Sequence, residues 1–407
     1  MARNLLIPQQ NNTDILHRSE VHQANIIRCL GKSKFPMTLP QIAEAIKISI
    51  PTCTKLIKEL AKKNLVAKMG KKSTENGRRP ATYTLNKEKF FAVGVEILSK
   101  FIHVSVVGLD FQTVYEKVNR DFMLEDTDHC LRFIINFISD TIKSSKIQKD
   151  NIIGVGIGLI ENIAGKIGKP MTFFQNKAIP IKDQIENALG LPVLIDNDTR
   201  VIAIAEQVLG LAKGVENVIV VKVSRTLGMG IIINGLIITG SAGLSGNISH
   251  TQFRKSSRLC YCGKKGCLGT AIGGDALMQD FKEALENNQK SIHFNADKLE
   301  TYKYHDILDA ASLGDELSIY LVQKQGFELG EALGNVLNIF NPELLIIDGE
   351  YLMLDQLFID AVKNGLRKTT LVNLLQCCEV KGSTLGRYLS SKAGAAMLFK
   401  QYDLVGA

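Results

Sequence analysis

Apolar side chains recur three and four residues apart in three short segments near the start of the chain, 21–30, 38–46 and 49–60. This spacing places the apolar side chains on one face of a helix, so each segment is predicted to be a short amphipathic helix. Thr38 begins a capping-box pattern, and Ser49 stands at the N-cap position of the third helix. Two short helices joined by a tight turn are the helix-turn-helix pattern.

Two strand-like segments follow these helices, at 65–69 and 81–85. The loop between them, residues 70–80, is basic and contains two glycines. A hairpin with such a loop after a helix-turn-helix is typical of a wing. Residues 1–88 are therefore predicted to form a winged helix-turn-helix domain.

From about residue 90 to the end, strand-like runs alternate with helical patterns, which predicts an α/β fold. A first set opens with two adjacent strands between 91 and 107, and a second set begins at 218–221. Two successive sheets with crossover helices imply two lobes, with ligands bound at the carboxyl ends of the strands. We therefore expect a first α/β lobe at 89–205 and a second at 206–384.

The positive charge of the chain is concentrated at its start. Residues 1–87 hold 16 Lys and Arg against 5 Asp and Glu, whereas the remaining 320 residues hold 33 against 36. A basic small domain on a slightly acidic body indicates a polyanionic partner for the small domain alone. Hydroxyls and cations on the outward side of the third helix and in the loop are the candidate DNA contacts: Thr52, Thr54, Lys55, Lys58, Arg78 and Arg79. The alternative is a protein-interaction domain whose basic face is only solvated.

The composition is that of an ordinary globular protein, with 45% apolar and 22% charged residues. No apolar stretch reaches 18 residues free of charge, so no transmembrane helix is expected, and Met1–Gln10 lacks the long apolar run of a signal peptide. Eight cysteines are present, three in one loop and the others scattered through apolar patterns. This distribution favours a reducing cytoplasm over a disulfide framework.

One histidine and three cysteines have the spacing of a metal site. His250 is followed by Cys260, Cys262 and Cys267, with glycines between the last two that let the loop turn tightly. Tetrahedral Zn²⁺ takes thiolate sulfurs at roughly 2.3 Å and imidazole nitrogens at about 2.0–2.1 Å, and these side chains offer that donor set. Because four protein ligands leave no open position for a substrate, the metal is predicted to be structural.

Three loops at predicted strand ends carry further polar side chains. The first, Asp196–Thr199, offers the Asp198 carboxylate, which can accept a proton, bind a polyol hydroxyl or simply cap the following helix. The second, Ser224–Gly230, is a glycine-bearing hairpin that can lie against phosphate or serve only as a turn. The third, Gly243–His250, runs directly into the metal loop.

Together these features resemble the ROK family of sugar kinases and sugar-responsive repressors over nearly the whole chain. Besides the metal motif, the resemblance rests on Asn197-Asp198, Asn338-x-x-Asn341-Pro342-Glu343, Gly394-Ala395-Ala396, and the Gly77-Arg78-Arg79-Pro80 run of the repressor branch. It implies an actin-like, hexokinase-like ATPase fold, with a C-terminal helix at about 385–407 returning to the first lobe and a dimer surface on the second. The sugar-binding candidates that it implies are Asn197, Asp198, Asn247 and His250.

The chain departs from the kinase pattern at its nucleotide loops. The kinases carry Asp-x-Gly-Gly-Thr after the first strand, where this chain has Glu96-Ile97-Leu98-Ser99-Lys100. A later Gly-Thr-Gly reads Arg225-Thr226-Leu227, and a Gly-Gly near the adenosine site reads Asp348-Gly349. Bulky side chains block the approach of backbone to phosphate, and positioning supplies most of the catalysis of phosphoryl transfer. We therefore expect that kinase activity is lost and that Asp198, the base in the kinases, is vestigial.

The sugar side departs as well. The kinases' Glu-x-Gly-His reads Asn247-Ile248-Ser249-His250, and the Glu after their zinc motif reads Gly269. Each lost carboxylate removes hydrogen bonds worth roughly 1.5–3 kcal/mol, which predicts a weak or altered ligand preference.

The sequence thus predicts a cytoplasmic, sugar-responsive transcriptional regulator, in the first place a repressor, of carbohydrate uptake or catabolism genes. Its expected partners are double-stranded operator DNA, a small sugar or sugar-phosphate effector, and further copies of the chain as a homodimer or a dimer of dimers, with no membrane. Two alternatives stay open: an active sugar kinase with an added DNA-binding domain, and a regulator controlled by a transport-system protein.

Overall fold

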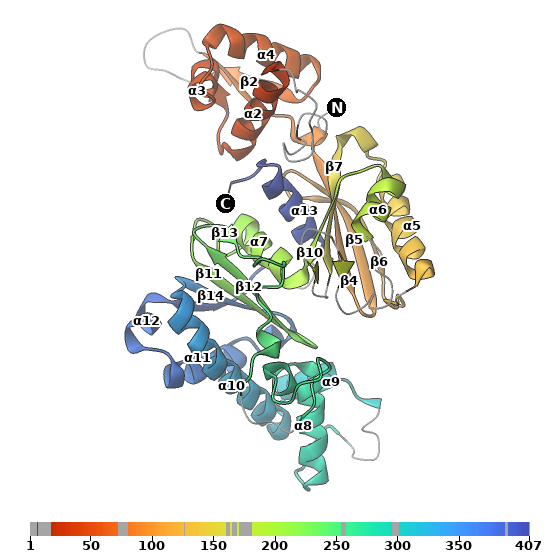
Figure 1. The fold of residues 1–407 in the computed structure, drawn as a ribbon, viewed down its shortest axis with the longest axis vertical. Helices are drawn as coiled ribbons and strands as arrows, with labels where there is room; N and C mark the ends of the chain where they lie inside the picture. Colours follow the sequence, from red (N-terminus) through yellow and green to blue (C-terminus); the bar gives the residue numbers. More distant parts are fainter. Residues whose placement is uncertain are drawn as a thin grey trace. The chain divides into compact units, whose positions relative to one another are not determined.

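The computed structural model describes residue 6 and residues 18–71, 80–125, 127–159, 163–164, 169–170, 181–253, 258–294, 301–386 and 390–406. The chain forms two compact units (Figure 1). The first combines Met1–Val208 with Tyr388–Ala407, and the second is the continuous segment Leu209–Arg387. Among the described helices, none combines the length and the apolar character needed to span a bilayer.

From residue 18 onward, the described part of the first unit starts with three helices and a small sheet. These elements are α2 (Arg18–Lys32), α3 (Leu39–Ala45), α4 (Ile50–Lys62), β1 (Met37–Thr38), β2 (Val66–Lys71) and β3 (Ala81–Leu85). The three predicted helices and both strands of the hairpin are confirmed, with β2 antiparallel to β3 and Val66 opposite Leu85. The short strand β1 pairs with the other edge of β3 and was not predicted. Arg78 and Arg79 lie outside the described residues.

Local contacts explain where α3 and α4 begin. The backbone N–H of Thr38 donates to Gln41 Oε1 at 2.9 Å, and the backbone N–H of Thr52 donates to Ser49 Oγ at 3.3 Å. Lys47, between the two helices, has a left-handed φ of 56°, which turns the chain sharply. Both caps that the sequence pattern indicated are therefore formed, and the two helices follow each other as in a helix-turn-helix.

The first unit also contains a five-stranded sheet with the order β10-β7-β4-β5-β6. Its strands are β4 (Phe91–Leu98), β5 (Phe101–Gly108), β6 (Thr113–Asn119), β7 (Ile152–Leu159) and β10 (Val193–Asn197). The strands β4, β7 and β10 run parallel, whereas β5 and β6 are antiparallel additions at one edge. A separate two-stranded sheet pairs β8 (Ile163–Ala164) with β9 (Lys169–Pro170).

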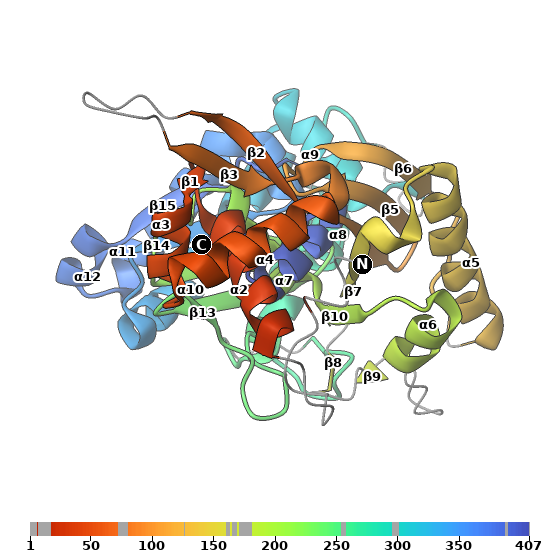
Figure 2. The ribbon, with the colours of Figure 1, turned by 90° about the horizontal axis from the view of Figure 1, so that it is seen from above.

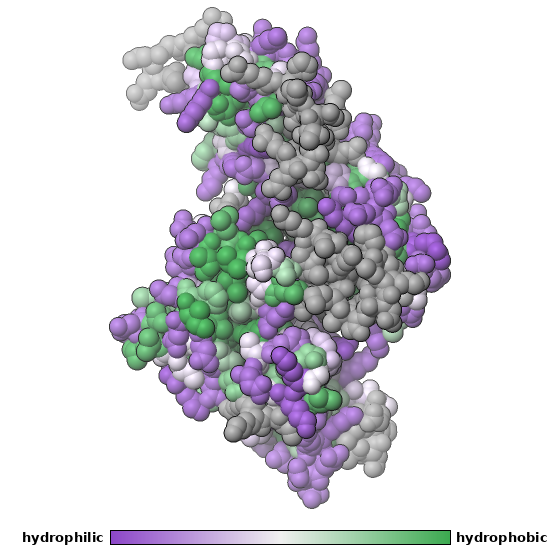
Figure 3. All heavy atoms as spheres, in the orientation of Figure 1, coloured by the Kyte–Doolittle hydropathy of each residue, from purple (hydrophilic) through white to green (hydrophobic). Residues whose placement is uncertain are grey.

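Two helices, α5 (Asp128–Ser144) and α6 (Ile181–Leu189), cover one face of this sheet and lie side by side (Figures 1 and 2). Their apolar stripes pack on alternate residues of the strands, such as Val93 and Val95 of β4. The outward side of α5 is hydrophilic (Figure 3), as expected of an amphipathic helix. A further helix, α7 (Asp198–Leu209), directly follows β10.

The opposite face of β4 and β7 carries α13 (Ser390–Gln401), which approaches the strands unusually closely. A Cβ atom on Gly94 of β4 would lie 1.7 Å from the backbone oxygen of Ser391. A Cβ on Gly156 of β7 would lie 2.1 Å from the backbone oxygen of Gly394. Glycine is therefore required at these positions because backbone packs directly against backbone.

The residues after α13 pack against α2. Tyr402 and Leu404 belong to the same hydrophobic cluster as Ile26, Ile27 and Leu30 of α2 and Leu56, Ile57 and Leu60 of α4. A Cβ on Gly31 would lie 2.5 Å from the backbone oxygen of Leu404, and Lys32 forms a 2.5 Å ion pair with Asp403. The C-terminal segment thus completes the core beneath the N-terminal helices.

The second unit has its own five-stranded sheet with the order β13-β12-β11-β14-β15. The strands are β11 (Val218–Val223), β12 (Leu227–Ile233), β13 (Leu236–Ile237), β14 (Leu344–Asp348) and β15 (Glu379–Gly382). The helices are α8 (Gly274–Glu286), α9 (Tyr304–Ser312), α10 (Glu316–Phe340), α11 (Asp355–Thr369) and α12 (Val372–Cys377). Mixed sheets with helices in both units confirm the predicted α/β fold class.

The main core of the second unit lies between its sheet and the α10–α11 pair. Ile219 and Val221 of β11 and Ile347 of β14 pack there against the helices. The helices touch backbone to backbone, since a Cβ on Gly330 would lie 2.1 Å from the Val362 oxygen. Glycine at position 330 is therefore what lets the two helices pack this closely.

Candidate metal centre and neighbouring polar loops

The metal-ligand candidates come from one loop region of the second unit, between β13 and α8. His250 ends one short 3-10 turn, and Cys267 immediately precedes another. Cys260 and Cys262 lie in the tight turn between them, in which the two glycines have φ values of 85° and 80°. Glycine adopts this left-handed backbone at no steric cost, which accounts for both glycines of the motif. Residues 254–257 of the loop lie outside the described part of the chain.

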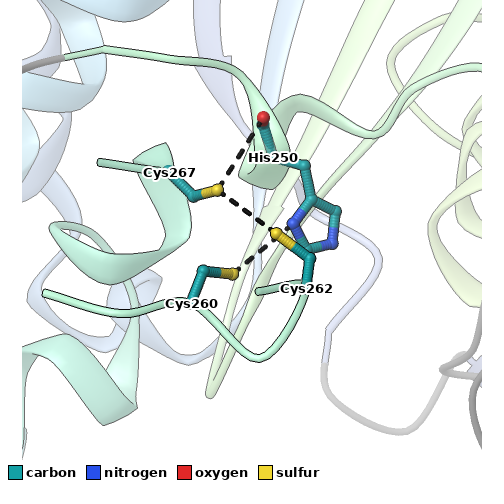
Figure 4. Close-up of side chains that lie close together, drawn as sticks. All are labelled: His250, Cys260, Cys262 and Cys267. Carbon is teal, nitrogen blue, oxygen red and sulfur yellow. Dashed lines mark hydrogen bonds between the residues drawn. The ribbon is translucent and has the colours of Figure 1, made fainter. Parts of the chain in front are cut away.

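The four side chains converge as the spacing predicted (Figure 4). Their ligand atoms all lie within 4.8 Å of one another. Cys260 Sγ is 3.6 Å from His250 Nδ1, and Cys262 Sγ is 3.5 Å from Cys267 Sγ. All four are free to act as ligands, because the cysteines form no disulfide.

These separations suit a tetrahedral metal ion. Metal–ligand distances of about 2.3 Å for sulfur and 2.05 Å for nitrogen place two sulfurs about 3.8 Å apart, and a sulfur and a nitrogen about 3.5 Å apart. The observed 3.5 and 3.6 Å edges lie within a few tenths of an ångström of those values. The donor set and its geometry therefore fit a metal held by four protein ligands.

Protonation of the thiol ligands opposes metal binding. Burial, together with the neighbouring Cys262 and Cys260, raises the pKa of the Cys267 thiol to about 12. A backbone hydrogen bond at Lys264 lowers the pKa of the exposed Cys262 thiol, and burial lowers the pKa of His250. Because metal ligands must be deprotonated, binding releases protons, and the apparent metal affinity must rise with pH.

A charged network that the sequence gave no sign of anchors the base of the loop. Arg258, two residues before Cys260, donates to the Thr270 carbonyl at 3.2 Å and contacts Asp280 at 2.5 Å and Glu283 at 2.8 Å. The Asp280 side chain, only 6% exposed, is also paired with Lys324 of α10 at 2.9 Å. Arg258 thus ties the start and the end of the metal loop to α8.

The loop that leads into the metal site places Asn247 and Ser249 beside it. Asn247 Nδ2 donates to the Leu244 carbonyl at 2.9 Å, which fixes its amide. A Cβ on Gly269 would meet the Ser249 Cβ at 3.1 Å and the Ser249 oxygen at 3.3 Å. The Ser249 side chain therefore fills the space that a longer side chain at 269 needs, so the two departures from the kinase pattern compensate each other sterically.

In the first unit, Asp198 is the first residue of α7 and is 8% exposed. The capping role falls to its neighbour Asn197, whose Oδ1 accepts from the backbone N–H groups of Thr199 at 3.0 Å and Arg200 at 3.3 Å. Asp196 Oδ1 accepts from Arg200 Nε at 2.7 Å. The Oδ1 atom of Asn197 is therefore used by the helix. The sugar-binding candidates are divided between the units, with Asn247 and His250 in the other.

The positions of the kinases' nucleotide loops have the following geometry. A two-residue turn, Ser99–Lys100, joins β4 to β5, and Glu96 just before it is 6% exposed. Arg225, in the turn between β11 and β12, donates through Nε to both carboxylate oxygens of Asp275 at 3.1 and 3.2 Å. Asp275 lies in the first turn of α8. The positive charge of Arg225 is thus countered from within its own unit.

Of the DNA-contact candidates, the described ones lie on α4. Lys55 and Lys58 are exposed, while the buried side of the helix presents Leu56, Ile57 and Leu60. Thr54 Oγ1 donates to the Ile50 carbonyl at 2.8 Å, and Thr52 Oγ1 lies 2.7 Å from Ser49 Oγ. The two lysines are therefore free to face a partner, whereas the threonine hydroxyls already bond within the helix.

The chain is similar in sequence and in structure to known proteins. The chain is 26% identical over 402 residues to the transcriptional dual regulator NagC of Escherichia coli, covering 98% of this chain and 96% of NagC. It is 25% identical over 371 residues to the xylose repressor of Bacillus subtilis, covering 90% and 92%. A ROK-family transcriptional regulator described as a homologue of the E. coli MLC protein has the same fold, with a TM-score of 0.81, 23% identity, and coverage of 95% and 98%.

A glucokinase from Streptomyces griseus, solved with glucose and AMPPNP, also shares the fold over 76% of this chain and 99% of its own, with a TM-score of 0.65 and 22% identity. The likeness to kinases and to a regulator agrees with the two-lobed fold that the sequence implied. The model of the ROK family matches residues 92–402, more than three quarters of the sequence. The chain belongs to the ROK family.

Proposed function

We propose that this chain is a DNA-binding transcriptional regulator, in the first place a repressor, whose response to a small sugar or sugar phosphate controls genes of carbohydrate uptake or catabolism. The observation that carries the proposal is α4, capped by Ser49 and buried on one side, which presents Lys55 and Lys58 to solvent. The dual regulator NagC and the xylose repressor of Bacillus subtilis align over 98% and 90% of this chain, which includes α4. A recognition helix with exposed cations suits a major groove.

The proposed mechanism couples two states of the chain. An effector that binds one conformation of the body more tightly shifts the population toward it, and a shift that misplaces the two helix-turn-helix regions of a dimer lowers operator affinity. A homodimer or a dimer of dimers suits a palindromic operator. Asn197, Asp198, Asn247 and His250 are the proposed sugar contacts, and Arg78 and Arg79 are proposed to contact DNA from the wing.

In the second unit, we propose that the metal is Zn²⁺, held by His250, Cys260, Cys262 and Cys267. The ion would supply structural cohesion to the loop, because four protein ligands leave no position for a substrate. Protein contacts also hold the loop in place. Arg258 links it to Asp280 of α8, and the Asn247 amide is fixed by its hydrogen bond to the Leu244 carbonyl. Elemental analysis should find about one zinc per chain.

DNA binding is tested with the full chain and the DNA upstream of its own operon, by fluorescence anisotropy at several salt concentrations. Wild-type affinity should fall steeply with salt, and Lys55→Ala/Lys58→Ala should reduce the slope of log K against log salt by up to about 1.8, or about 0.9 per lost phosphate contact. Lys143→Ala on α5, which removes an exposed lysine far from α4 in the sequence, is the matched control. Failure of the wild-type chain to bind would overturn the proposal.

The second candidate function is a sugar kinase, and the buried Asp198 at the start of α7 favours it. Coupled detection of ADP with hexoses and pentoses distinguishes the two. A regulator without kinase activity should release no ADP above background. Turnover that is abolished in Asp198→Asn would establish the kinase instead.

A further inference from the structure

Tyr261 has a contact that neither the fold nor the family motif requires. It stands between Cys260 and Cys262, and its side chain is 72% exposed, so it adds little to the hydrophobic core. Its hydroxyl nevertheless lies 2.9 Å from His250 Nε2. The two rings meet edge to face, with centroids 5.0 Å apart and planes at 79°. A ring that stands largely in solvent gains little from burial, so its directed contact with His250 suggests a function.

The contact divides the two nitrogens of His250 between different tasks. Nδ1 faces the thiol cluster, 3.6 Å from Cys260 Sγ, which is the separation expected across an edge of a tetrahedral metal site (Figure 4). Nε2 points to the phenol of Tyr261. A metal-bound imidazole must be neutral, so with Nδ1 on the metal, Nε2 carries the hydrogen and donates it to the Tyr261 oxygen.

We propose that Tyr261 is a positioning residue: it selects Nδ1 of His250 as the metal ligand and occupies the Nε2 that an effector hydroxyl would otherwise use. This inference rests on the proposed zinc site. Hydrogen bonds to the outer nitrogen of a ligating histidine commonly fix its tautomer and ring orientation. Here the partner is supplied from within the loop, one residue from two of the ligands.

One consequence concerns recognition of a sugar. His250 can contact an effector only after Tyr261 swings away, and the exposure of Tyr261 leaves it room to do so. While Tyr261 is in place, Asn247 is the sugar-contact candidate of this loop that can still bind an effector. Its amide oxygen has no hydrogen-bond partner among the described residues. The sequence predicted that His250 binds both the metal and the sugar. In this arrangement Nδ1 would bind the metal, and Nε2 would be available to a sugar only when Tyr261 has moved away.

The test uses the zinc-loaded full chain and two variants, Tyr261→Phe and, as the matched control, Tyr320→Phe. Tyr320 of α10 is 57% exposed and lies outside the metal loop, so its substitution removes a surface hydroxyl of the same kind. Zinc transfer to a chromogenic chelator should be about tenfold faster in Tyr261→Phe, because outer-shell partners of metal ligands are typically worth 10–100-fold in affinity. The control should keep the wild-type rate.

A second measurement separates positioning from general loosening of the loop. In wild-type protein labelled with ¹⁵N-histidine, long-range proton–nitrogen spectra should show His250 bound to the metal through Nδ1 and protonated at Nε2. A wild-type transfer rate in Tyr261→Phe, or a metal bound through Nε2, would overturn the proposal. Zinc content of the wild-type chain is measured first, so that absence of zinc, which refutes the metal assignment, is distinguished from an error about Tyr261.

Discussion

Replacing Arg258 by alanine should weaken the second unit and loosen its metal loop together. The guanidinium contacts the Asp280 carboxylate at 2.5 Å and the Thr270 carbonyl at 3.2 Å, and only 18% of the side chain is exposed. Burial would lower the pKa of Arg258, but its hydrogen bonds and charge interactions with Asp280 and Glu283 raise it. The guanidinium therefore stays charged. Asp280, whose side chain is 6% exposed in the wild-type structure, loses one of its cationic partners when Arg258 is replaced.

The expected loss of stability depends on the contacts that remain to Asp280 and Glu283. Breaking a buried pair by removing one partner costs about 3–5 kcal/mol when the other charge is left uncompensated. Here Lys324 stays paired with Asp280 at 2.9 Å, and the Glu283 side chain, 52% exposed, is resolvated at little cost. We therefore expect Arg258→Ala to lower the free energy of unfolding of the second unit by about 2–3 kcal/mol, below the full cost of an unpaired charge.

Urea unfolding of zinc-loaded and zinc-stripped protein, with chelator-driven zinc release, measures both effects. Arg367→Ala is the matched control, because Arg367 is exposed on α11 and its described hydrogen bond is to the neighbouring Asn364. The variant should lose stability in both forms and release zinc faster, whereas the control should match wild type. A loss below about 0.5 kcal/mol, the range of ordinary surface substitutions, would refute the reasoning that Arg258 anchors the loop.

Three further predictions concern other parts of the chain. Burial acts to raise the pKa of Asp315, but hydrogen bonds led by Ser318 lower it below 3.8, so the stabilisation by Asp315 is present above that pH and is lost on acidification. Asp315→Ala should lower the free energy of unfolding, measured with urea at neutral pH, by about 2 kcal/mol, and should reduce the loss of stability at acidic pH. Gly94→Ala should cost about 3 kcal/mol or more in thermal unfolding, because its Cβ would lie 1.7 Å from the Ser391 oxygen, and near-wild-type stability would contradict the close approach of α13. Burial lowers the pKa of His103 below 6.5 despite its hydrogen bond to Glu116, so protonation of His103 opposes folding. The free energy of unfolding should therefore fall as the pH drops from 6.5 to 5, and His103→Gln should remove this pH dependence.

Features fixed by short sequence distances could be predicted from the sequence. The caps at Thr38 and Ser49 depend on residues three positions away, and both form as expected. The metal ligands fall within eighteen residues, and the glycine turn between Cys262 and Cys267 brings their sulfurs to 3.5 Å. Local spacing carries such contacts because the chain between the partners is too short to place them elsewhere.

Features that depend on distant partners could not be predicted. Asp280 and Lys324 are 44 residues apart, and Gly94 meets Ser391 only because the chain returns to its first sheet. The edge strand β6 was missed because its residues alternate between half-buried and exposed with few large apolar side chains. Asn197 was considered as a sugar ligand, and its role as the helix cap became visible only from the backbone around it.

The return of α13 to the first sheet also sets an order of events during synthesis. The second unit is continuous from Leu209 to Arg387 and is complete in the nascent chain before α13 is made. The first unit needs α13 and the Tyr402–Leu404 segment to fill the core beneath α2, so it can close only after these residues have left the ribosome. A product terminated before α13 would therefore have a complete second unit but would lack the support beneath its N-terminal helices.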